Sequence, residues 1–508
     1  MIRRSAQRQP DRVCVIERDR STTFREMDVA ANRIANYLRA AGIAQGSKVA
    51  TLCGNSTDYL QFIFGVHKAG LVWVPVNIVL GLEEIGYIIE HAEARLMLID
   101  EVLFDRLGFD AFVRNSGISY LVIESSTASS RPRLGEVIRD QPSTELPLAV
   151  EPDELAMIMY TSGTTSRAKG VMHCHHAVIS AVFSNVGELS ITRDDRVLVF
   201  LPMFHIAAHC LCMTFLAAGA SVVLQKGFDA GASLEAIEKH KVTFLVGLPM
   251  MFQAMLDHPR RRSTDLSSLR VCNYAMAPMA KTVLERLIAE FCPTFLLTSG
   301  QTEAYPHTVI FRPEEQLRRF GNYWGQGVLG NDVAIMDDLG NLLPAGQIGE
   351  IVYRGPNMML GYYKDPEATL EASRFGWHHS GDLGAFDQDG QLRFVDRKKD
   401  IIKSGGENVA SVKVEEVILR HPAVAAVAVV GIPHPRWQEA ILACVQLRPD
   451  SEVTAHDIIT HCKAHLGGFE VPKAVEFVDD MPLTASAKLR KIDLRERFLE
   501  FFMSEAAG

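Results

Sequence analysis

The chain has no apolar run long enough to cross a bilayer. None of the apolar segments in its 508 residues approaches the roughly 18 residues that a membrane-spanning helix needs. Residues 1–5 are followed by no apolar segment of the secretory type, so we expect no signal peptide and a cytoplasmic location. Internal repeats and low-complexity tracts are also missing.

A net positive charge is missing too, and the cysteines show no pairing pattern. A net charge of −9 argues against nonspecific binding of nucleic acid. Nine scattered cysteines, an odd number, favour reduced thiols over a disulfide framework. Residues 173–176 read His-Cys-His-His, but neighbouring side chains on a strand point to opposite faces and rarely share an ion. We therefore expect no metal site at these histidines.

Helical and strand patterns alternate through the first three quarters of the chain. Residues 24–44 and 59–69 carry apolar residues at helical spacing. Short apolar runs typical of buried strands lie between and after them, at residues 48–53, 71–76, 155–159, 197–202, 220–224 and 243–248. Strands separated by helices predict an α/β fold with largely parallel sheets.

Past residue 330 the pattern changes to short alternating segments with Gly-Asn and Asp-Gly turns, which indicates antiparallel β structure. The polar stretch 396–400 then precedes a compact tail that has its own helices and strands. A chain of 508 residues is too long for one core. We expect a large domain at residues 1–398 and a small α+β domain at 399–508, joined by a hinge.

Residues 160–171, Y-T-S-G-T-T-S-R-A-K-G-V, are the most informative segment for function. Hydroxyl residues alternate with glycine and the loop ends on Lys169, so backbone N–H groups, hydroxyls and one ammonium are available to a phosphate chain. The Walker A pattern is absent, because Ala168 and Gly170 flank this lysine. The loop alone does not exclude an ordinary surface turn.

Further motifs follow in a fixed order: 202–205 (P-M-F-H), 299–303 (S-G-Q-T-E), 349–350 (G-E), 354–356 (R-G-P), 361–363 (G-Y-Y), 380–382 (S-G-D), 396–397 (D-R), 404–408 (S-G-G-E-N), and 482–484 (P-L-T) with Lys488. With this set, the chain resembles the adenylate-forming superfamily, in its acyl-CoA synthetase branch, over nearly its whole length. The resemblance implies that ATP and a carboxylic acid form an acyl-adenylate, which coenzyme A thiol then converts to a thioester.

The resemblance also assigns roles to residues. Glu303 is expected to bind Mg²⁺, because hard cations favour carboxylate oxygen. Lys488 is expected to bridge the acid and the α-phosphate, and His205 to lie beside the acid; these three form the expected catalytic set. The residues expected to contact the nucleotide are Thr161, Ser162, Gly163, Thr164, Thr165, Lys169, Met276, Ala277, Pro278, Ser299, Gly300, Gln301, Thr302, Asp382 and Arg397.

The remaining implied positions concern the acyl group, coenzyme A and the hinge. Ser404, Gly405 and Gly406 match the loop that the pantetheine arm passes, and Lys399 matches the pivot about which the small domain turns. The expected acyl-binding residues are His205, Ala207, Ala208, Gly247, Met251 and Tyr274. Because these segments are apolar and contain small alanines, we expect a bulky or medium-to-long hydrophobic acid.

Four departures from the family pattern lie on the ATP side. Ser166 and Ala487 replace glycines, Met276 is bulkier than usual, and Ser299 replaces an aromatic residue. A left-handed glycine replaced by serine costs about 1 kcal/mol or more. Two readings stay open: a complete two-step ligase, or an enzyme that takes a preformed acyl-AMP from a partner adenylating enzyme and only makes the thioester.

Three other classes share this scaffold. An acyl-AMP ligase would load a carrier protein, a luciferase-like enzyme would oxidise the adenylate, and a non-catalytic protein would only bind an acyl nucleotide. The glycines near residue 405 favour coenzyme A, and the retained Lys488, Glu303 and Asp382 argue against a non-catalytic role.

Overall fold

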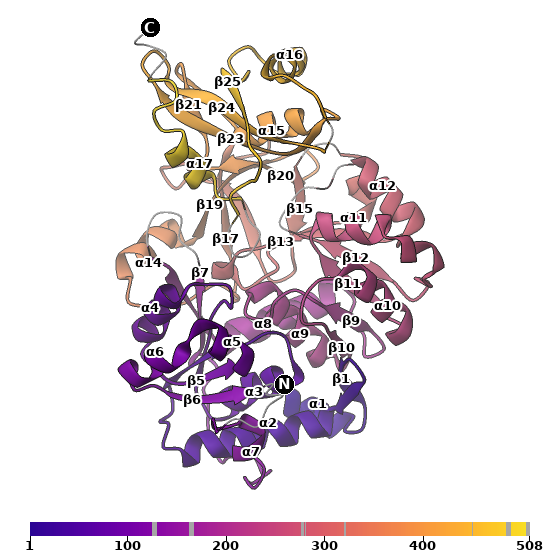
Figure 1. Cartoon of the computed structure of the whole chain (residues 1–508), viewed down its shortest axis with the longest axis vertical. Coiled ribbons are helices and arrows are strands. Elements are labelled where there is room, and N and C mark those ends of the chain that lie inside the picture. The colour runs from indigo at the N-terminus through magenta and orange to yellow at the C-terminus, as the bar shows by residue number, and fades with distance from the viewer. Residues whose placement is uncertain are drawn as a thin grey trace. The chain divides into compact units, whose positions relative to one another are not determined.

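The computed structural model describes residues 1–123, 130–161, 167–275, 279, 281–319, 322–449, 451–483 and 489–503 (Figure 1). The chain divides into two compact units. Unit 1 comprises Met1–Val333 and Tyr353–His378, and unit 2 comprises Ala334–Val352 and His379–Gly508. Across the described ranges, no helix combines the length and the apolar character that a membrane crossing requires. All nine cysteines are buried and none forms a disulfide.

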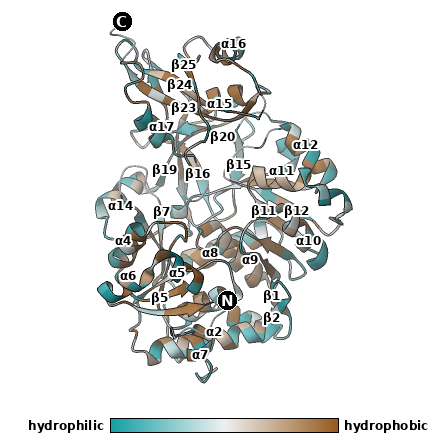
Figure 2. Cartoon of the chain, viewed as in Figure 1, coloured by the Kyte–Doolittle hydropathy of each residue, from teal (hydrophilic) through white to brown (hydrophobic). Residues whose placement is uncertain are grey.

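The first sheet of unit 1 has seven strands in the order β18-β8-β7-β4-β3-β5-β6. The strands β3, β4, β5, β6 and β7 pair in parallel, while β7 with β8 and β8 with β18 are antiparallel. Their bounds are β3 Lys48–Leu52, β4 Val72–Pro75, β5 Ala94–Asp100, β6 Ser119–Ile123, β7 Leu155–Thr161, β8 Lys169–Cys174 and β18 Gly361–Tyr362. The middle of β5 is buried and apolar, and it is brown in Figure 2.

A second sheet in unit 1 runs in the order β15-β14-β13-β12-β11-β9-β10-β1-β2. The six strands from β13 to β1 pair in parallel, and the strands at both ends are antiparallel. Their bounds are β1 Val13–Glu17, β2 Arg20–Thr23, β9 Arg196–Val199, β10 Ser221–Leu224, β11 Phe244–Gly247, β12 Val271–Tyr274, β13 Phe295–Ser299, β14 Val309–Phe311 and β15 Tyr323–Gly327. The predicted α/β fold with largely parallel sheets is confirmed.

Helices connect these strands and pack closely. The helix α2 (Phe24–Ala40) begins with a capping box, in which Thr23 and Glu26 satisfy each other's backbone N–H groups. It packs against α3 (Thr57–Lys68) so tightly that a Cβ on Gly65 would lie 2.3 Å from Ile34 Cγ2. The other long helices of unit 1 are α4 Leu82–Ala92, α8 His175–Glu188, α9 Ile206–Ala218, α10 Ala230–His240, α11 Pro249–Asp257 and α12 Lys281–Glu290.

Unit 2 contains a β meander and a separate α+β layer. The meander strands run in the order β16-β17-β19-β20, with bounds β16 Asp332–Met336, β17 Gly349–Arg354, β19 His378–Phe386 and β20 Leu392–Arg397. A five-stranded sheet follows in the order β22-β21-β24-β23, with β25 against β24. Its strands are β21 Ile402–Ser404, β22 Glu407–Val409, β23 Val424–His434, β24 Gln438–Leu447 and β25 Ala474–Phe477.

The helices of this layer lie around the long β23–β24 hairpin (Figure 1). They are α15 Ser411–Leu419, α16 Ala455–His465 and α17 Lys491–Arg497. Two apolar clusters form its core: Val414, Val429 and Ile441 belong to one, and Val430 and Leu442 to the other. Neighbouring residues of one strand thus enter different clusters, as the alternation of a strand buried on both faces requires. The predicted α+β character of the tail is confirmed.

Candidate functional site

The two ends of the phosphate loop lie side by side. Thr161 closes β7 and pairs directly with Lys169, the first residue of the antiparallel β8. The loop therefore joins two strands of a hairpin rather than a strand and a helix. Four of its predicted phosphate contacts and one departure lie outside the described residues: Ser162, Gly163, Thr164, Thr165 and Ser166. The Lys169 ammonium lies 5.0 Å from the ring centre of Tyr362.

That same tyrosine contacts the predicted Mg²⁺ ligand. The Tyr362 hydroxyl donates to Glu303 Oε1 over 3.0 Å, and Met359 N donates to the Glu303 carbonyl over 2.8 Å. Glu303 belongs to a short 3₁₀ turn, Thr302–Ala304, that follows β13. Lys169 and Glu303, which the family resemblance assigns to the phosphates and the cation, thus share Tyr362 as a neighbour.

A buried histidine forms a hydrogen bond with the backbone of this turn. His173 is fully buried on β8, and its Nε2 lies 2.7 Å from the Thr302 carbonyl oxygen. A carbonyl only accepts, so this nitrogen must carry the proton. Burial lowers the pKa of His173 to about 4, against the opposing effect of the Thr302 hydrogen bond. His173, which was not expected to bind a metal, therefore fixes the backbone of Thr302. No local sequence signal indicates this role.

Side-chain hydrogen bonds brace the rest of this segment. Asn357 Nδ2 donates to the carbonyls of Ala304 and Tyr305, at 3.2 and 3.0 Å. The next carbonyl, that of Pro306, accepts from Asn185 Nδ2 over 3.1 Å. Close packing adds to this restraint, because a Cβ on Gly300 would lie 2.8 Å from Pro306 Cβ. The other predicted nucleotide contacts here are Ser299, which ends β13, and Gln301, whose Oε1 lies 3.2 Å from His378 Nε2.

Three buried histidines make the stability of this region depend on pH. Burial lowers the pKa of His173 and of His307 to about 4, and that of His209 to about 3. Because these pKa values lie below the ordinary histidine pKa of 6.5, the unfolded chain binds more protons than the folded chain between pH 6.5 and 4. Stability therefore rises with pH through this window.

We expect the urea midpoint to fall between pH 7 and pH 5, and His173→Gln to reduce that fall. His456→Gln, at an exposed histidine, serves as the control; an unchanged midpoint in the wild-type protein would contradict the expectation.

The predicted acyl-binding residues lie on or next to α9, β11, α11 and β12. His205 precedes α9 at its N-cap, Ala208 is buried on that helix, and Ala207 is half-buried. Gly247 ends β11 and Met251 lies on α11. The structure does not test their acyl contacts, which stay predictions.

Two tyrosines in this region have buried polar partners. Tyr274 is buried at the end of β12, and its hydroxyl donates to Gln316 Oε1 over 2.9 Å. Tyr305 Oη lies 2.7 Å from His209 Nδ1, and the His209 ring lies 4.5 Å from that of Trp73. The predicted adenine contacts Met276, Ala277 and Pro278 lie outside the described residues.

In unit 2 the two predicted ribose contacts face each other. Asp382 on β19 pairs with Arg397 on β20, and Arg397 Nε lies 3.9 Å from Asp382 Oδ1. Ser380 Oγ accepts from Asp382 N over 3.0 Å and helps to fix the strand here. Motifs separated by some fifteen residues in the sequence are thereby placed opposite each other on adjacent strands, as the hairpin requires.

A buried carboxylate supports the turn before Asp382. Glu350 accepts from Gly381 N at 3.0 Å, and its other oxygen lies 3.1 Å from His379 Nδ1 and 3.2 Å from Lys398 Nζ. Burial acts to raise the pKa of Glu350, but these partners outweigh it and lower the pKa. The sequence pattern contained this glutamate without assigning it a role.

The predicted coenzyme A residues form a tight turn. Ser404 and Glu407 pair across β21 and β22, so that Gly405 and Gly406 are the two turn residues. Both glycines have positive φ, +62° and +88°, as such two-residue hairpin turns require. Turn geometry therefore accounts for the glycines by itself, and the coenzyme A contact stays a prediction. Lys399, the predicted pivot, is exposed in the turn after β20.

Lys488 and Ala487 lie outside the described residues, but the chain on either side of residues 484–488 is pinned. Leu483 pairs with Leu489 in an antiparallel bridge, and Arg490 N donates to the Pro482 carbonyl over 2.8 Å.

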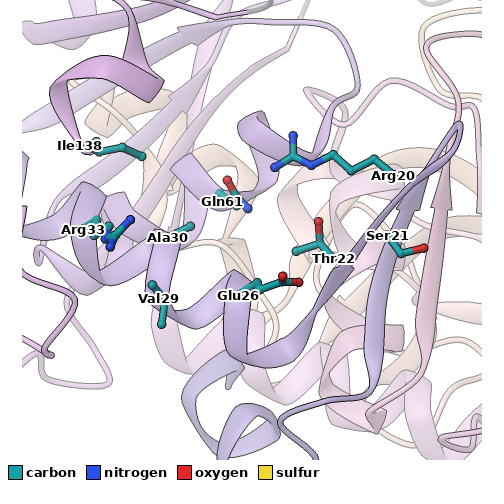
Figure 3. A pocket seen from close by; sticks show the side chains of 9 residues that line it. All are labelled: Arg20, Ser21, Thr22, Glu26, Val29, Ala30, Arg33, Gln61 and Ile138. Carbon is teal, nitrogen blue, oxygen red and sulfur yellow. The ribbon is translucent and has the colours of Figure 1, made fainter. Parts of the chain in front are cut away.

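A cavity of about 300 Å³ lies on another part of unit 1, between β2, α2 and α3 (Figure 3). None of the predicted site residues lines it. Its Arg20 is paired with Asp58 at 3.3 Å, and its Glu26 serves the helix cap. We assign no ligand to it.

Comparisons with known proteins cover almost the entire chain. The family model described as AMP-binding enzyme matches residues 2–363, and that of the AMP-binding enzyme C-terminal domain matches residues 413–488. A feruloyl-CoA synthase from Amycolatopsis sp is 36% identical over 97% of this chain and 98% of its own.

Two solved structures are also similar. ATP-bound MatB from Rhodopseudomonas palustris has a TM-score of 0.89 at 27% identity, with 97% of each chain covered. The o-succinylbenzoate CoA synthetase of Bacillus subtilis, in complex with the acyl-adenylate OSB-AMP, has a TM-score of 0.87 at 28% identity with the same coverage. The chain therefore belongs to the AMP-binding, adenylate-forming enzymes and is a ligase of their acyl-CoA synthetase branch.

Proposed function

We propose that the protein joins a hydrophobic carboxylic acid to coenzyme A through an acyl-adenylate. The observation that carries this proposal is the meeting of Lys169, Thr302 and Glu303 around β8 and Tyr362. An ammonium, a hydroxyl residue and a carboxylate placed together suit a triphosphate with its cation. The pairing of Asp382 with Arg397 in unit 2 supports a ribose contact.

Glu303 has the donor chemistry for Mg²⁺. Its Oε1 accepts from Tyr362, and its Oε2 accepts no hydrogen bond from any described residue. The described residues contain no cluster of three or more side chains that could hold a metal alone. This composition suits Mg²⁺, which is commonly bound by one or two carboxylates together with substrate phosphates. In the bound state the cation would neutralise charge on the phosphate oxygens.

The acid that we propose is bulky and apolar, with an aromatic acid as the first choice. The small Ala207 and Ala208 on the predicted acyl side support it, as does the name of the feruloyl-CoA synthase relative. For the second step we propose that the pantetheine arm of coenzyme A passes along Ser404, Gly405 and Gly406. A small domain at residues 399–508 would turn about Lys399 between the two steps, in a cytoplasmic enzyme.

Thioester formation from a supplied acyl-AMP is the second candidate. Ser166, Met276, Ser299 and Ala487 favour it, because all four depart from the family pattern on the ATP side. In that case a partner enzyme would supply the adenylate. Transfer to a carrier protein is a further alternative for the second step.

Two assays on the unmodified enzyme separate these candidates. With ATP, Mg²⁺ and a panel of aromatic and medium-to-long acids, pyrophosphate release measures adenylation. With chemically prepared acyl-AMP and coenzyme A, thioester yield measures the second step. We expect activity in both, and Ala487→Gly to increase only pyrophosphate release, because glycine relaxes the backbone beside Lys488. Thioester yield without pyrophosphate release would favour the second candidate, and the absence of both activities would contradict the proposal.

A further inference from the structure

Tyr362 is held in a fixed position between two charges. Its backbone pairs with β8, and its N–H donates to Thr369 Oγ1 over 2.9 Å. Gly361, with φ +140°, lets Thr369 approach this closely, since a Cβ there would lie 2.6 Å from Thr369 Cγ2. The hydroxyl of the half-buried Tyr362 then reaches Glu303 over 3.0 Å, and Lys169 lies over its ring.

The hydroxyl acts on the orientation of the carboxylate. The Tyr362 O–H donates to the Glu303 carboxylate over 3.0 Å. Donation to Oε1 restricts rotation of the Glu303 carboxylate and leaves Oε2 to a cation. Carboxylates that bind metals are commonly oriented by such hydrogen bonds.

The ring acts on the lysine. An ammonium beside a free carboxylate tends to form an ion pair, which would neutralise both groups before the nucleotide arrives. Here the Lys169 ammonium lies on the face of the Tyr362 ring at 5.0 Å, a cation–π contact, and makes no ion pair with Glu303. One side chain therefore keeps apart two charges that the proposed reaction needs separately.

We propose that Tyr362 is a positioning residue: it orients Glu303 toward Mg²⁺ and keeps the Lys169 ammonium available to the phosphates. This inference rests on the proposed function, because it assumes that Glu303 binds the cation of Mg·ATP.

The test removes one hydroxyl and measures cation binding. Tyr362→Phe keeps the ring under Lys169 and loses only the hydrogen bond to Glu303. Binding of Mn²⁺, with a non-hydrolysable ATP analogue present, is followed by electron paramagnetic resonance. We expect affinity to fall about 10- to 100-fold, the usual cost of losing such a supporting hydrogen bond. A thermal unfolding midpoint equal to that of the wild-type protein shows that the variant is folded.

The neighbouring tyrosine provides the matched control. Tyr363→Phe makes the same chemical change one residue further on, where the hydroxyl donates to Glu93 over 3.0 Å. We expect wild-type Mn²⁺ binding from it. Equal Mn²⁺ affinities of Tyr362→Phe and the wild-type protein would overturn the inference.

Glu303→Gln separates failure of this inference from failure of the proposed function. If Glu303→Gln weakens Mn²⁺ binding and Tyr362→Phe does not, Glu303 binds the cation without help from the tyrosine. If neither changes binding, Glu303 is no ligand and the cation role in the proposed function fails as well. In the double variant, the effect of Tyr362→Phe should disappear, since the hydroxyl acts through the carboxylate.

Discussion

Replacing Lys491 with methionine is expected to lower the free energy of unfolding of unit 2 by about 3–5 kcal/mol. Lys491 lies at the start of α17, with 11% of its side chain exposed, and pairs over 2.8 Å with Glu415, of which 14% is exposed. Its ammonium also donates to Ser411 Oγ over 2.6 Å. Methionine fills a similar volume but leaves the Glu415 carboxylate buried without its cation.

The loss extends to a second carboxylate. Asp396 is buried and accepts from both Ser411 N and Ser411 Oγ, so Lys491 reaches it through that hydroxyl. The other oxygen of Asp396 accepts from Arg397 N over 2.7 Å. Asp396 is thus linked to the ammonium through the Ser411 hydroxyl, and hydrogen exchange in residues 396–419 should rise in the variant.

A matched lysine lies on the same helix as Glu415. Lys413 pairs with Glu470, but 54% of its side chain is exposed. Its partner Glu470 has only 9% of its side chain exposed, but water that reaches the Lys413 ammonium screens the pair, so Lys413→Met should cost less stability than Lys491→Met. Adding Glu415→Gln to Lys491→Met should recover part of the loss. Equal effects of the two lysine variants would contradict the importance of burial.

The effect of Lys491→Met should also depend on pH. Burial raises the pKa of Glu415, while Lys491 opposes the shift and Asp396 adds to it. Without Lys491 this pKa rises further, so the folded variant takes up a proton at higher pH than the unfolded chain does. A raised carboxyl pKa gives stability that is present at low pH and is lost as pH rises through the folded pKa. The difference between variant and wild type should therefore shrink toward acidic pH.

Sequence periodicity predicted most elements, because burial repeats along the chain. The predicted helix at residues 24–44 is α2, which ends at Ala40; Gly42 then takes a left-handed φ of +78° and leads the chain out of the helix. The predicted strand at 48–53 is β3, Lys48–Leu52. Element ends depend on caps and turns, and these contain weaker signals than the apolar repeat does.

The partners of the motifs could not be predicted in the same way. His173 and Thr302 are 129 residues apart, and Tyr362 and Glu303 are 59 apart, so no local pattern relates them. The sequence contained each residue, and the sheet order brings them together. Similarly, Ala334–Val352 belongs to unit 2 although it precedes Tyr353–His378 of unit 1. Such crossings of the chain between compact units arise from tertiary pairing, which composition does not encode.

Lys488→Ala is expected to separate the two half-reactions. Lys488 should stabilise the negative charge that develops between the acid and the α-phosphate. Loss of one such stabilising group costs about 10²- to 10³-fold in rate. Pyrophosphate release should fall by this factor, while thioester formation from supplied acyl-AMP stays within a few-fold. Both assays must be run on one preparation, so that a folding defect would lower both rates together.

Asp382→Ala is the complementary change. An AMP ribose is present in both half-reactions, so loss of a ribose contact should slow both, in contrast to Lys488→Ala. Asp338→Ala is its control: Asp338 also lies in unit 2, but 85% of its side chain is exposed and it pairs with Lys398 at 2.7 Å. If Lys488→Ala slowed both half-reactions equally and Asp382→Ala slowed neither, two steps on one bound nucleotide would no longer explain the enzyme. We expect Lys488→Ala to slow only the first half-reaction and Asp382→Ala to slow both. This combination follows only if the lysine serves the first step and the aspartate holds the nucleotide in both steps.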